Sequence, residues 1–453
     1  MLDITYIREN TGKVKKACEA KQVKCDVDRI LELDKQIKIL LPQKEGWRAE
    51  QKKLGGKDIK KASQLKKEIK DAENFLRDTR NELMILLHQL PNISLEGVPA
   101  GGEKNNQVLR QVGKVPSFDF EAKDHLALGE DLDVIDVKRA AKISGARFAY
   151  LKGDAALLEF ALVQLAIEEA RKEGFTPIVP PVLVRGGNLE ELGYDMGNYY
   201  LVSDERCPKC NHAISWRGKV LCEECGTNQE TEVVVSEGAE RLKCHYCKEL
   251  TRLTYFYLVG TAEHAIAPMH SKEIFEERDL PKRYVGFSSA FRRESGTYGK
   301  DTRGILRVHQ FDKVELISFT KPEDSQKEHE LLLNIEERLW KKLEIPYQVV
   351  QLASGDSSLP SASTIDIEAW LPGQGKYREV SSASNTTAFQ ARRLNIRYRG
   401  EKGTEFVHIL NATGFAIGRT LIAIVENYQE KDGSIAIPKV LQQYVGKKKI
   451  EKK

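Results

Sequence analysis

The sequence predicts an α+β fold in which helices flank an antiparallel sheet, with a projecting pair of N-terminal helices and a small zinc-ribbon-like insertion. Three observations predict it. Apolar residues recur at three- and four-residue spacing through the first 90 residues, two alternating segments enclose a glycine-rich loop between Phe287 and Glu315, and three CxxC pairs lie within residues 203–252. We expect an N-terminal helical domain over 1–100, a main domain over 115–445 that contains the insertion 203–252, and a basic tail over 446–453.

Length and composition limit the class of protein. The chain has 453 residues, of which 41% are hydrophobic and 30% charged, as expected of a soluble globular protein with two or three domains. It contains no run of about 18 apolar residues and its N-terminus lacks the apolar segment of a signal peptide, so we expect a cytoplasmic protein that binds no membrane. The net charge of +4 does not indicate a nucleic-acid binder, so any RNA contact must come from local clusters.

A pair of antiparallel helices is predicted over residues 30–90, because two heptad stripes are separated by Gly55-Gly56. Pro42 is expected to kink the first helix. The first stripe consists of Ile30, Leu33, Ile37, Leu40, Lys44, Trp47, Gln51 and Leu54, and the second of Leu65, Ile69, Ala72, Leu76, Thr79, Leu83, Leu86 and Leu90. Such a hairpin is too thin to hold a globular core, so we expect it to project as an arm.

Basic residues cover the outer faces of this arm, with few acids between Lys52 and Lys67. They are Lys35, Lys38, Arg48, Lys52, Lys53, Lys57, Lys60, Lys61, Lys66, Lys67 and Lys70. Two interpretations stand side by side: a merely solvated helix surface, or a surface that follows a phosphate backbone without contacting bases.

The next segments form a linker and the entry to the main domain. Residues 91–118 have the Pro and Gly content of a linker, and residues 144–174 end in an amphipathic helix. The segment from Gly174 to Val184 then predicts an edge strand closed by Pro180-Pro181. At the other end of the chain, the lysine-rich tail is expected to be disordered.

The cysteine-rich insertion predicts a metal site, because CxxC directs two thiolates at one ion and two such pairs complete a tetrahedral S4 site for zinc. The preferred ligands are Cys207, Cys210, Cys222 and Cys225. Cys244 and Cys247 either replace the middle pair or join His212 or His245 in a second site; a redox dithiol or unligated thiols are the further alternatives. Cys18 and Cys25, far from these pairs in the sequence, are interpreted as ordinary thiols.

The segment from Phe287 to Glu315 predicts an antiparallel hairpin with a charged face. Residues 287–293 form one expected strand and residues 305–313 the other. The hairpin carries Arg292, Arg293, Glu294, Arg307, His309 and Glu315, whose burial would be costly unless they are paired or meet a ligand. Guanidinium groups suit the oxygens of a polyphosphate, whereas a solvated edge hairpin with cross-strand ion pairs is the alternative.

Four long segments resemble class II aminoacyl-tRNA synthetases, and specifically the seryl-tRNA synthetases. FRRESGTYGKDTRGILRVHQFDKVE, which ends at Glu315, is similar to their motif 2, and NATGFAIGRTLIAIVENYQ, which begins at Asn411, to their motif 3. YLVGTAEH (257–264) resembles the serine-pocket segment and YREVSSASNTTAFQARR (377–393) the ATP-side strand. The helix and strand over 144–184 resemble motif 1, which forms the dimer in this class. The resemblance implies a class II synthetase sheet in a catalytic domain over 115–445.

The resemblance implies that ATP and serine react to seryl-adenylate and pyrophosphate, and that the seryl group then passes to the 3′ end of tRNA-Ser. Charging of tRNA-Sec is left open. The implied catalytic residues are Arg292, which contacts the α-phosphate, Arg419, which holds the γ-phosphate, and Glu294 on the adenine or ribose side. The implied ATP site consists of Arg292, Arg293, Glu294, Glu379, Val380, Ser381, Ser382 and Arg419, with Mg²⁺ bound by Glu379 and Ser382.

For serine, the resemblance implies contacts from Thr261, Ala262, Glu263, Arg292, Glu315, Asn385 and Thr413. Buried polar groups of this kind would be left unpaired by alanine or glycine, which is how a small polar substrate is selected. Thr413 stands where the family usually has serine and Arg293 also departs from the family pattern. His264 is interpreted as a packing residue.

The partners that the resemblance implies are serine, tRNA-Ser gripped by the arm, and a second copy of the chain in a homodimer. The zinc is predicted by the cysteine spacing alone, and we expect it to be structural because the ordinary members of the family need none. Two other classes of function compete: a serine-sensing or RNA-binding regulator without catalysis, and an amino-acid:carrier-protein ligase. The arginines and glutamates of the site argue against the regulator, and the N-terminal hairpin argues against the carrier-protein ligase.

Overall fold

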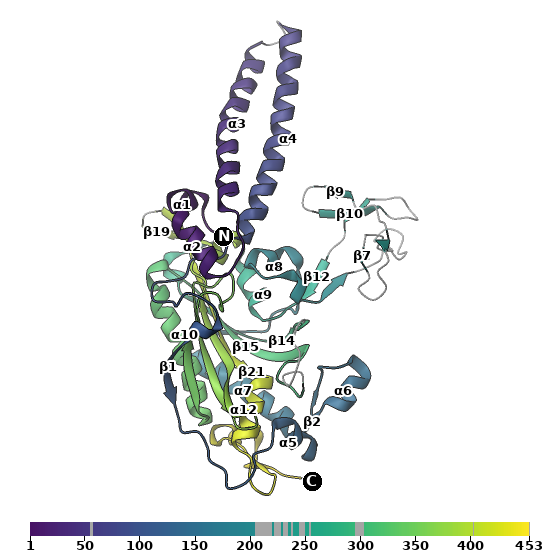
Figure 1. Cartoon of the computed structure of the whole chain (residues 1–453), viewed down its shortest axis with the longest axis vertical. Helices are drawn as coiled ribbons and strands as arrows, with labels where there is room; N and C mark the ends of the chain where they lie inside the picture. Colours follow the sequence, from purple (N-terminus) through teal and green to yellow (C-terminus); the bar gives the residue numbers. More distant parts are fainter. Residues whose placement is uncertain are drawn as a thin grey trace.

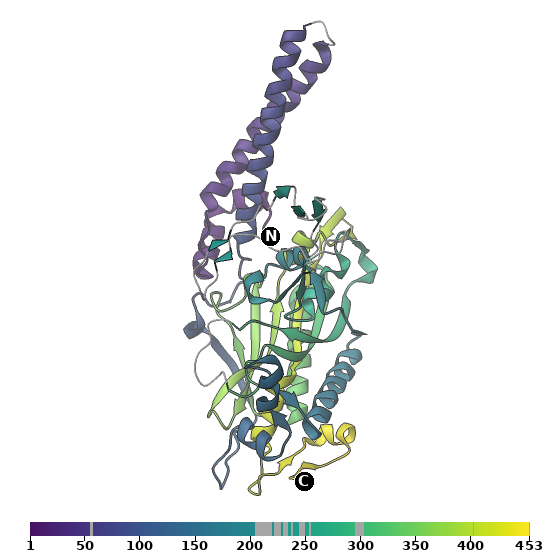
Figure 2. The ribbon, with the colours of Figure 1, turned by 90° about the vertical axis from the view of Figure 1, so that its right-hand side faces the viewer.

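The computed structural model describes residues 1–54, 58–203, 220–221, 228–229, 234–236, 239–243, 250–252, 255–294, 303–401 and 403–452. A long helical arm rises from a body built around one large sheet (Figure 1), and a view turned by 90° places the arm and the C-terminus at opposite ends of the molecule (Figure 2). No helix in the described ranges combines the length and the apolar character needed to cross a membrane.

The arm consists of α3 (Val27–Leu54) and α4 (Ile59–Gln89), as the heptad stripes predict. The stripe residues Ile30, Leu33, Leu65, Ile69 and Leu76 are buried between the helices. Ion pairs also join them: Arg29 lies 2.8 Å from Glu82, and Lys61 lies 2.7 Å from Glu50. The helix α3 continues through Pro42. The lysines that the structure describes between Lys52 and Lys70 are exposed, so the basic surface exists as predicted.

The base of the arm is anchored to the body by Lys21, which follows α1 (Ile4–Glu9) and α2 (Thr11–Ala20). Its buried ammonium group donates to Ser357 Oγ at 2.9 Å and to the carbonyl oxygens of Ser358 and Ser361 at 2.7 and 2.6 Å. Burial lowers the pKa of Lys21 to about 8. The three oxygen acceptors therefore fix the N-terminal helices to one loop of the body.

The body is built on an eight-stranded sheet with the order β1-β16-β17-β18-β21-β15-β14-β4. All neighbouring strands are antiparallel except β14 and β4, which are parallel. Their bounds are β1 Gln107–Val112, β4 Thr176–Ile178, β14 Lys282–Phe291, β15 Gln310–Thr320, β16 Tyr347–Gln351, β17 Ser363–Leu371, β18 Lys376–Asn385 and β21 His408–Ala416. The predicted antiparallel sheet is thus confirmed.

Three long helices pack against this sheet in one apolar core: α7 (Asp154–Lys172), α10 (Ser325–Leu343) and α12 (Ile417–Asn427). The remaining helices and strands of the body are short. They are α5 His125–Asp131, β2 Ile135–Asp136, α6 Val137–Ser144, β3 Tyr150–Leu151, β5 Leu183–Arg185, α8 Gly186–Leu192, α9 Glu263–Ile266, β13 Ile274–Glu276, α11 Phe389–Leu394, β19 Arg397–Gly400, β20 Gly403–Phe406, β22 Ile435–Ala436, α13 Gln442–Val445 and β23 Lys449–Ile450.

Two stretches predicted to be irregular form strands. The expected linker 91–118 contains β1, which pairs with β16 at the edge of the main sheet. The expected disordered tail contains β23, which pairs with β22, and its Ile450 is buried in the core. Lys447 pairs with Asp154 at 2.8 Å and Lys449 pairs with Glu430, while the one isoleucine of the tail supplies the burial.

The insertion leaves the body between β6 (Leu201–Ser203) and β12 (Tyr255–Leu258), two neighbouring antiparallel strands. Within it the structure describes β7 Val220–Leu221, β8 Asn228–Gln229, β9 Val234–Ser236, β10 Ala239–Lys243 and β11 Leu250–Arg252. The predicted zinc ligands, Cys207, Cys210, Cys222, Cys225, Cys244 and Cys247, all lie outside the described residues.

Candidate active site

The charged hairpin is present, but its second strand begins later than predicted. β14 and β15 pair from Lys282↔Phe319 to Phe291↔Gln310, so β15 begins at Gln310 and not at Ile305. Gly304 has φ +74°, a left-handed conformation that turns the chain before Ile305. Ile305, Leu306 and Val308 are consequently buried outside the sheet, where they line a hollow.

This hollow holds about 630 Å³ of space, including its open mouth. It lies above the centre of the sheet. Residues from β15, β18, β21 and α12 line it, together with residues from the segment that follows β14 and the segment that precedes β15. Those residues are Arg292, Glu294, Ile305, Leu306, Arg307, Val308, Phe311, Lys313, Glu379, Val380, Thr413, Ala416, Gly418 and Arg419. The arginines predicted from distant motifs therefore reach one cavity.

Arg292 and Arg419 enter the hollow from different elements. The Nε of Arg292 donates to the carbonyl oxygen of Gly260 at 3.2 Å, and its guanidinium carbon lies 5.3 Å from the centre of the Phe311 ring. Arg419, at the start of α12, forms an ion pair with Glu379 at 2.9 Å. Burial by itself would raise the pKa of Glu379, but the charge and hydrogen bond of Arg419, together with the charges of Arg292 and Lys313, outweigh burial and lower that pKa. Both guanidinium groups are held in place by a protein partner.

Behind the hollow lies a cluster of buried polar side chains around two glutamates, Glu263 and Glu315. Glu263 is fixed by two hydrogen bonds. Its Oε2 accepts from the Tyr194 hydroxyl at 2.7 Å and its Oε1 from Gln390 Nε2 at 2.7 Å, and the side chain is almost fully buried. Burial raises the pKa of Glu263, and the nearby Glu315 carboxylate raises it further. The two carboxylates therefore lie close enough to interact, and a cationic ligand between them would relieve their repulsion.

Glu315 is the second glutamate of this cluster. It accepts from Thr261 Oγ1 at 3.1 Å and pairs with Lys313 at 2.5 Å, and Lys313 also lines the hollow. Burial raises the pKa of Glu315, whereas the Lys313 ammonium group opposes that shift. This chain of contacts connects the predicted serine-binding residues Thr261 and Glu315 to the wall of the hollow.

Thr413 is positioned by a β-bulge. In the β15–β21 pairing Val314 is opposite Phe415 and Glu315 is opposite Thr413, so Gly414 is the extra residue. The backbone N–H of Thr413 instead donates to Glu336 Oε1 at 3.1 Å, from the middle of α10. Glu336 is completely buried, and burial, together with the charges of Asp366 and Glu315, holds the pKa of Glu336 well above its usual range. A buried carboxyl group thus supports the backbone of the residue that lines the inner wall.

Other predicted site residues point elsewhere. Ser381 Oγ accepts from Trp340 Nε1 at 3.1 Å, on the side of the sheet that α10 covers. The amide of Asn385 donates to Ser325 Oγ at 2.8 Å and its oxygen accepts from the Thr387 N–H at 2.8 Å, so both of its polar groups are used outside the hollow. Arg293 is exposed and is not part of the lining. Ala262 is buried beside Gly286 and presents no polar group.

The sequence did not predict five residues of the site, which are Tyr194, Lys313, Glu336, Asp366 and Gln390. Lys313 was within a quoted motif and could have been found from the alternation of β15, because it shares a face with Glu315. The others lie on elements far away in the chain, and no local pattern relates them to the site. His264 packs between the rings of Tyr194 and Tyr199, at 4.7 and 4.9 Å between ring centres, which agrees with its interpretation as a packing residue.

The residues near Glu379 fit a divalent cation that is bound mainly by phosphates. Ser382 is opposite Asp366 on the neighbouring strand, and the buried Asp366 Oδ1 has no hydrogen-bond partner among the residues that the structure describes. Burial and the Glu379 charge raise the pKa of Asp366 well above its usual range. Within the described ranges no three His, Cys, Asp or Glu side chains form a metal cluster. The carboxylate and hydroxyl oxygens here suit Mg²⁺, which is commonly bound by one or two carboxylates together with substrate phosphates.

Comparison with known proteins agrees with this geometry. Residues 246–428 match the tRNA synthetase class II core domain (G, H, P, S and T), and residues 1–94 match the seryl-tRNA synthetase N-terminal domain. The sheet and the hollow above it therefore define a class II aminoacyl-tRNA synthetase.

Full-length relatives narrow this class. The serine–tRNA ligase of Acidothermus cellulolyticus is 40% identical over 98% of both chains, and that of Thermodesulfovibrio yellowstonii is 39% identical over 98% of this chain and 99% of the relative. The crystal structure of Pyrococcus horikoshii seryl-tRNA synthetase complexed with ATP matches with a TM-score of 0.82 and 36% identity over the whole of both chains. The chain belongs to the seryl-tRNA synthetase family.

Proposed function

We infer that the chain is an ATP-dependent serine–tRNA ligase, which activates serine to seryl-adenylate and transfers the seryl group to the 3′ end of tRNA-Ser. The observation that carries this conclusion is the convergence of Arg292 and Arg419 on one hollow whose inner end leads to Glu315 and Glu263. A solved relative, the Naegleria fowleri enzyme in complex with AMP, matches with a TM-score of 0.80 and 30% identity, which supports a nucleotide in this site.

The first step needs no protein nucleophile, because the serine carboxylate attacks the α-phosphorus and pyrophosphate leaves. The protein supplies position and positive charge. We assign Arg292 to the α-phosphate, Arg419 to the γ-phosphate and Glu294 to the adenine or ribose side. Glu379 and Ser382 would hold Mg²⁺, which neutralises phosphate charge when bound. Val380 lines the same wall. The Arg293 side chain is not part of the lining and the Ser381 side chain bonds to Trp340, so we expect both residues to contribute through their backbone groups.

For serine, Glu263 and Glu315 offer carboxylates to the ammonium group and the hydroxyl, and Thr261 and Thr413 complete the polar lining. Both carboxyl groups have pKa values raised by burial, so the ammonium charge of the substrate stabilises their ionised forms. Alanine would fill the same space and leave these buried groups without a hydroxyl partner. The pocket is therefore expected to reject alanine.

Arg292→Ala is the direct test of this assignment. Serine-dependent ATP–pyrophosphate exchange should fall by at least about a hundredfold, because a positioned cation at the reacting phosphate is lost. Arg399→Ala is the control, since Arg399 is exposed and pairs with Glu276 away from the hollow. Exchange at the wild-type rate in the Arg292 variant would remove Arg292 from the site, and no exchange in the wild-type enzyme would favour a regulator instead of an enzyme.

We propose that tRNA-Ser binds along the basic surface of the arm and that the enzyme works as a cytoplasmic homodimer. The exposed lysines between Lys52 and Lys70 support the RNA contact. The dimer is supported by apolar side chains on α7 and beside β4, since Phe160 is 65% and Val179 84% exposed. Whether tRNA-Sec is also a substrate stays open.

A structural zinc in the insertion stays a prediction of the cysteine spacing. Metal analysis of the purified protein should give about one zinc per subunit, because four thiolates close one tetrahedral site. Replacing Cys207 and Cys210 by serine should release it. Replacement of Cys244 and Cys247 should leave it bound if the preferred ligands are right, and two zinc ions or none would contradict the assignment.

A further inference from the structure

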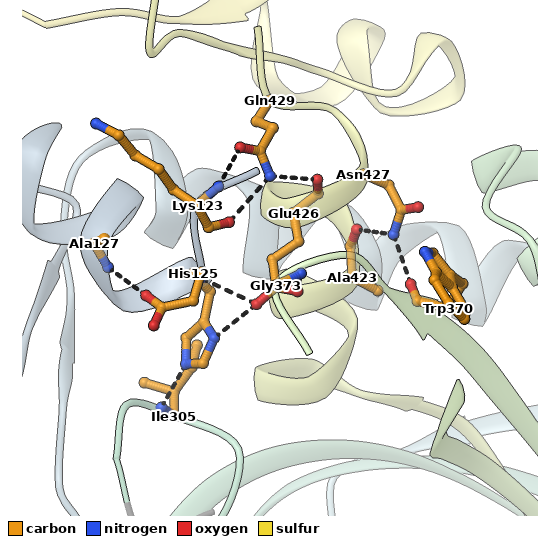
Figure 3. A network of polar contacts seen from close by, with 11 residues as sticks. Lys123, His125, Ala127, Ile305, Trp370, Gly373, Ala423, Glu426, Asn427 and Gln429 are labelled. Carbon is orange, nitrogen blue, oxygen red and sulfur yellow. Dashed lines mark hydrogen bonds and ion pairs between the residues drawn. The ribbon is translucent and has the colours of Figure 1, made fainter. Parts of the chain in front are cut away.

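A network of hydrogen bonds at the C-terminal end of α12 connects three separate parts of the chain to the nucleotide side of the hollow (Figure 3). His125, the first residue of α5, is at its centre. The network contains no residue of the predicted site, although Ile305 and Glu426 belong to the segments that resemble motifs 2 and 3.

Glu426 of α12 is completely buried and receives three N–H donors. Its Oε1 accepts from the backbone N–H of His125 at 3.0 Å and lies 3.1 Å from His125 Nδ1, and its Oε2 accepts from the Gly373 N–H at 2.9 Å. Gly373 belongs to the turn that joins β17 to β18. The carboxylate thus joins three elements, α5, α12 and the β17–β18 turn.

The other nitrogen of His125 holds the wall of the hollow. The backbone N–H of Ile305 donates to His125 Nε2 at 3.3 Å, so Nε2 is the acceptor and the ring proton is on Nδ1, where it faces Glu426. The opposite side of Ile305 is confined too, because a Cβ atom on Gly418 would lie 3.1 Å from the Ile305 carbonyl oxygen. Ile305 is therefore held between His125 and the first turn of α12.

The same helix carries Arg419. Because Glu426 follows Arg419 by seven residues, two turns of α12, the two side chains lie on one face of the helix. The contacts of His125 consequently fix the distance between the Ile305–Val308 wall and the helix that presents Arg419. Lys313 and Thr413 lie toward the serine side, where they bond to Glu315 and Glu336, and within the described part of the chain neither forms a hydrogen bond or ion pair with this network.

We propose that His125 is a positioning residue for ATP: with Glu426 as its partner, it holds the wall formed by Ile305, Leu306 and Val308 against α12, and so sets the width of the nucleotide half of the hollow. This inference rests on the proposed function. It assigns His125 no contact with substrate and no proton transfer.

Two substitutions of His125 distinguish the effect of its hydrogen bond to Glu426 from that of its hydrogen bond to Ile305. His125→Asn retains an N–H for Glu426 but is too short to reach Ile305, whereas His125→Gln places a carbonyl oxygen near the position of Nε2. We expect His125→Asn to raise both the Kd for MgATP, measured by calorimetry without serine or tRNA, and the KM for ATP in pyrophosphate exchange by about tenfold. KM for serine and kcat should change by less than about twofold, and His125→Gln should recover most of the affinity.

Gly304→Ala tests the same contact from the opposite side. A Cβ atom there would lie 2.1 Å from His125 Nε2, so alanine must displace the ring, and the Kd for ATP should rise as it does in His125→Asn. His270→Asn is a matched control, because His270 also pairs with a glutamate, Glu273 at 2.8 Å, but lies outside the hollow. It should bind ATP like the wild type.

The outcomes distinguish this inference from the proposed function. Wild-type protein that binds no ATP would refute the function itself. Wild-type protein that binds ATP while His125→Asn and Gly304→Ala bind it equally well would refute only the role of His125. A parallel rise of KM for ATP and for serine, or a lower melting temperature with unchanged KM values, would show that the network is merely structural.

Discussion

Glu336 is a buried carboxyl group whose Oε1 accepts from the Thr413 N–H, while its Oε2 has no hydrogen-bond partner among the described residues. Because burial raises the pKa of Glu336 well above its ordinary value of 4.5, the folded protein keeps this proton at pH values at which the same carboxyl group in the unfolded chain has lost it. The folded state therefore binds more protons in this range, and the free energy of unfolding contributed by Glu336 decreases as pH rises from the unfolded pKa toward the folded one.

Glu336→Gln should remove this dependence, because glutamine resembles the neutral acid in shape and keeps an oxygen for Thr413. Between pH 5 and 8 the free energy of unfolding of the wild type should fall more steeply than that of the variant, by up to about 1.4 kcal/mol per pH unit. Urea unfolding at several pH values measures both slopes, with Glu330→Gln, an exposed position on the same helix, as the control. Equal slopes in all three proteins would show that Glu336 is ionised when folded.

The arm can be removed as an element, since its helices bury their apolar stripes against each other. Replacing residues 36–83 by a short linker should leave serine-dependent pyrophosphate exchange unchanged but reduce charging of tRNA-Ser by at least about a hundredfold, because the phosphate contacts of the exposed lysines are lost. Both reactions are measured on the same preparation. Normal charging by the shortened protein would refute the role of the arm, and lost exchange would mean that the arm supports the body.

How far each element could be predicted depends on the source of its stabilisation. The arm has a stripe that repeats along its own sequence, and the hairpin β14–β15 alternates locally, so both were predicted. β1 was not predicted because, as an edge strand, it has an exposed surface without apolar alternation, with both Val108 and Leu109 exposed. Ile450 of β23 is a single apolar residue among lysines, and its burial depends on a partner strand fifteen residues earlier.

The same distinction applies to the site. Arg292, Glu315 and Arg419 belong to long motifs whose order along the chain is specific, and the structure brings them toward one hollow. Tyr194 and Gln390, which position Glu263, act through contacts between segments about 70 and 130 residues away, as the hydrogen bonds record. Ser381 was assigned to the ATP site and Asn385 to the serine site because neighbouring residues of the same motif belong there. The alternation along β18 and the bulge at Val380 instead direct their side chains to Trp340 and Ser325.

At the scale of the whole molecule, the exposed apolar side chains of α7 and the edge of β4 predict a second subunit. The chain has a mass of 51.2 kDa, and the wild type should sediment as a dimer. Introducing Phe160→Asp together with Val179→Asp should shift the protein to monomers, because each carboxylate would be buried without a partner. Ile59→Asp, at an equally exposed apolar residue of α4, is the control and should remain dimeric. A double variant that stays dimeric would place the interface elsewhere.

The anchor at Lys21 has a mechanical consequence for the molecule as a whole. Because its ammonium group is bonded to three oxygens of a single loop, the N-terminal helices cannot pivot freely where they meet the body. Any swing must then come from bending within α3 and α4. With 28 residues in α3, the arm extends about 42 Å beyond its foot. For the proposed tRNA contact, the length of these helices therefore sets how far the body of the RNA lies from the nucleotide hollow.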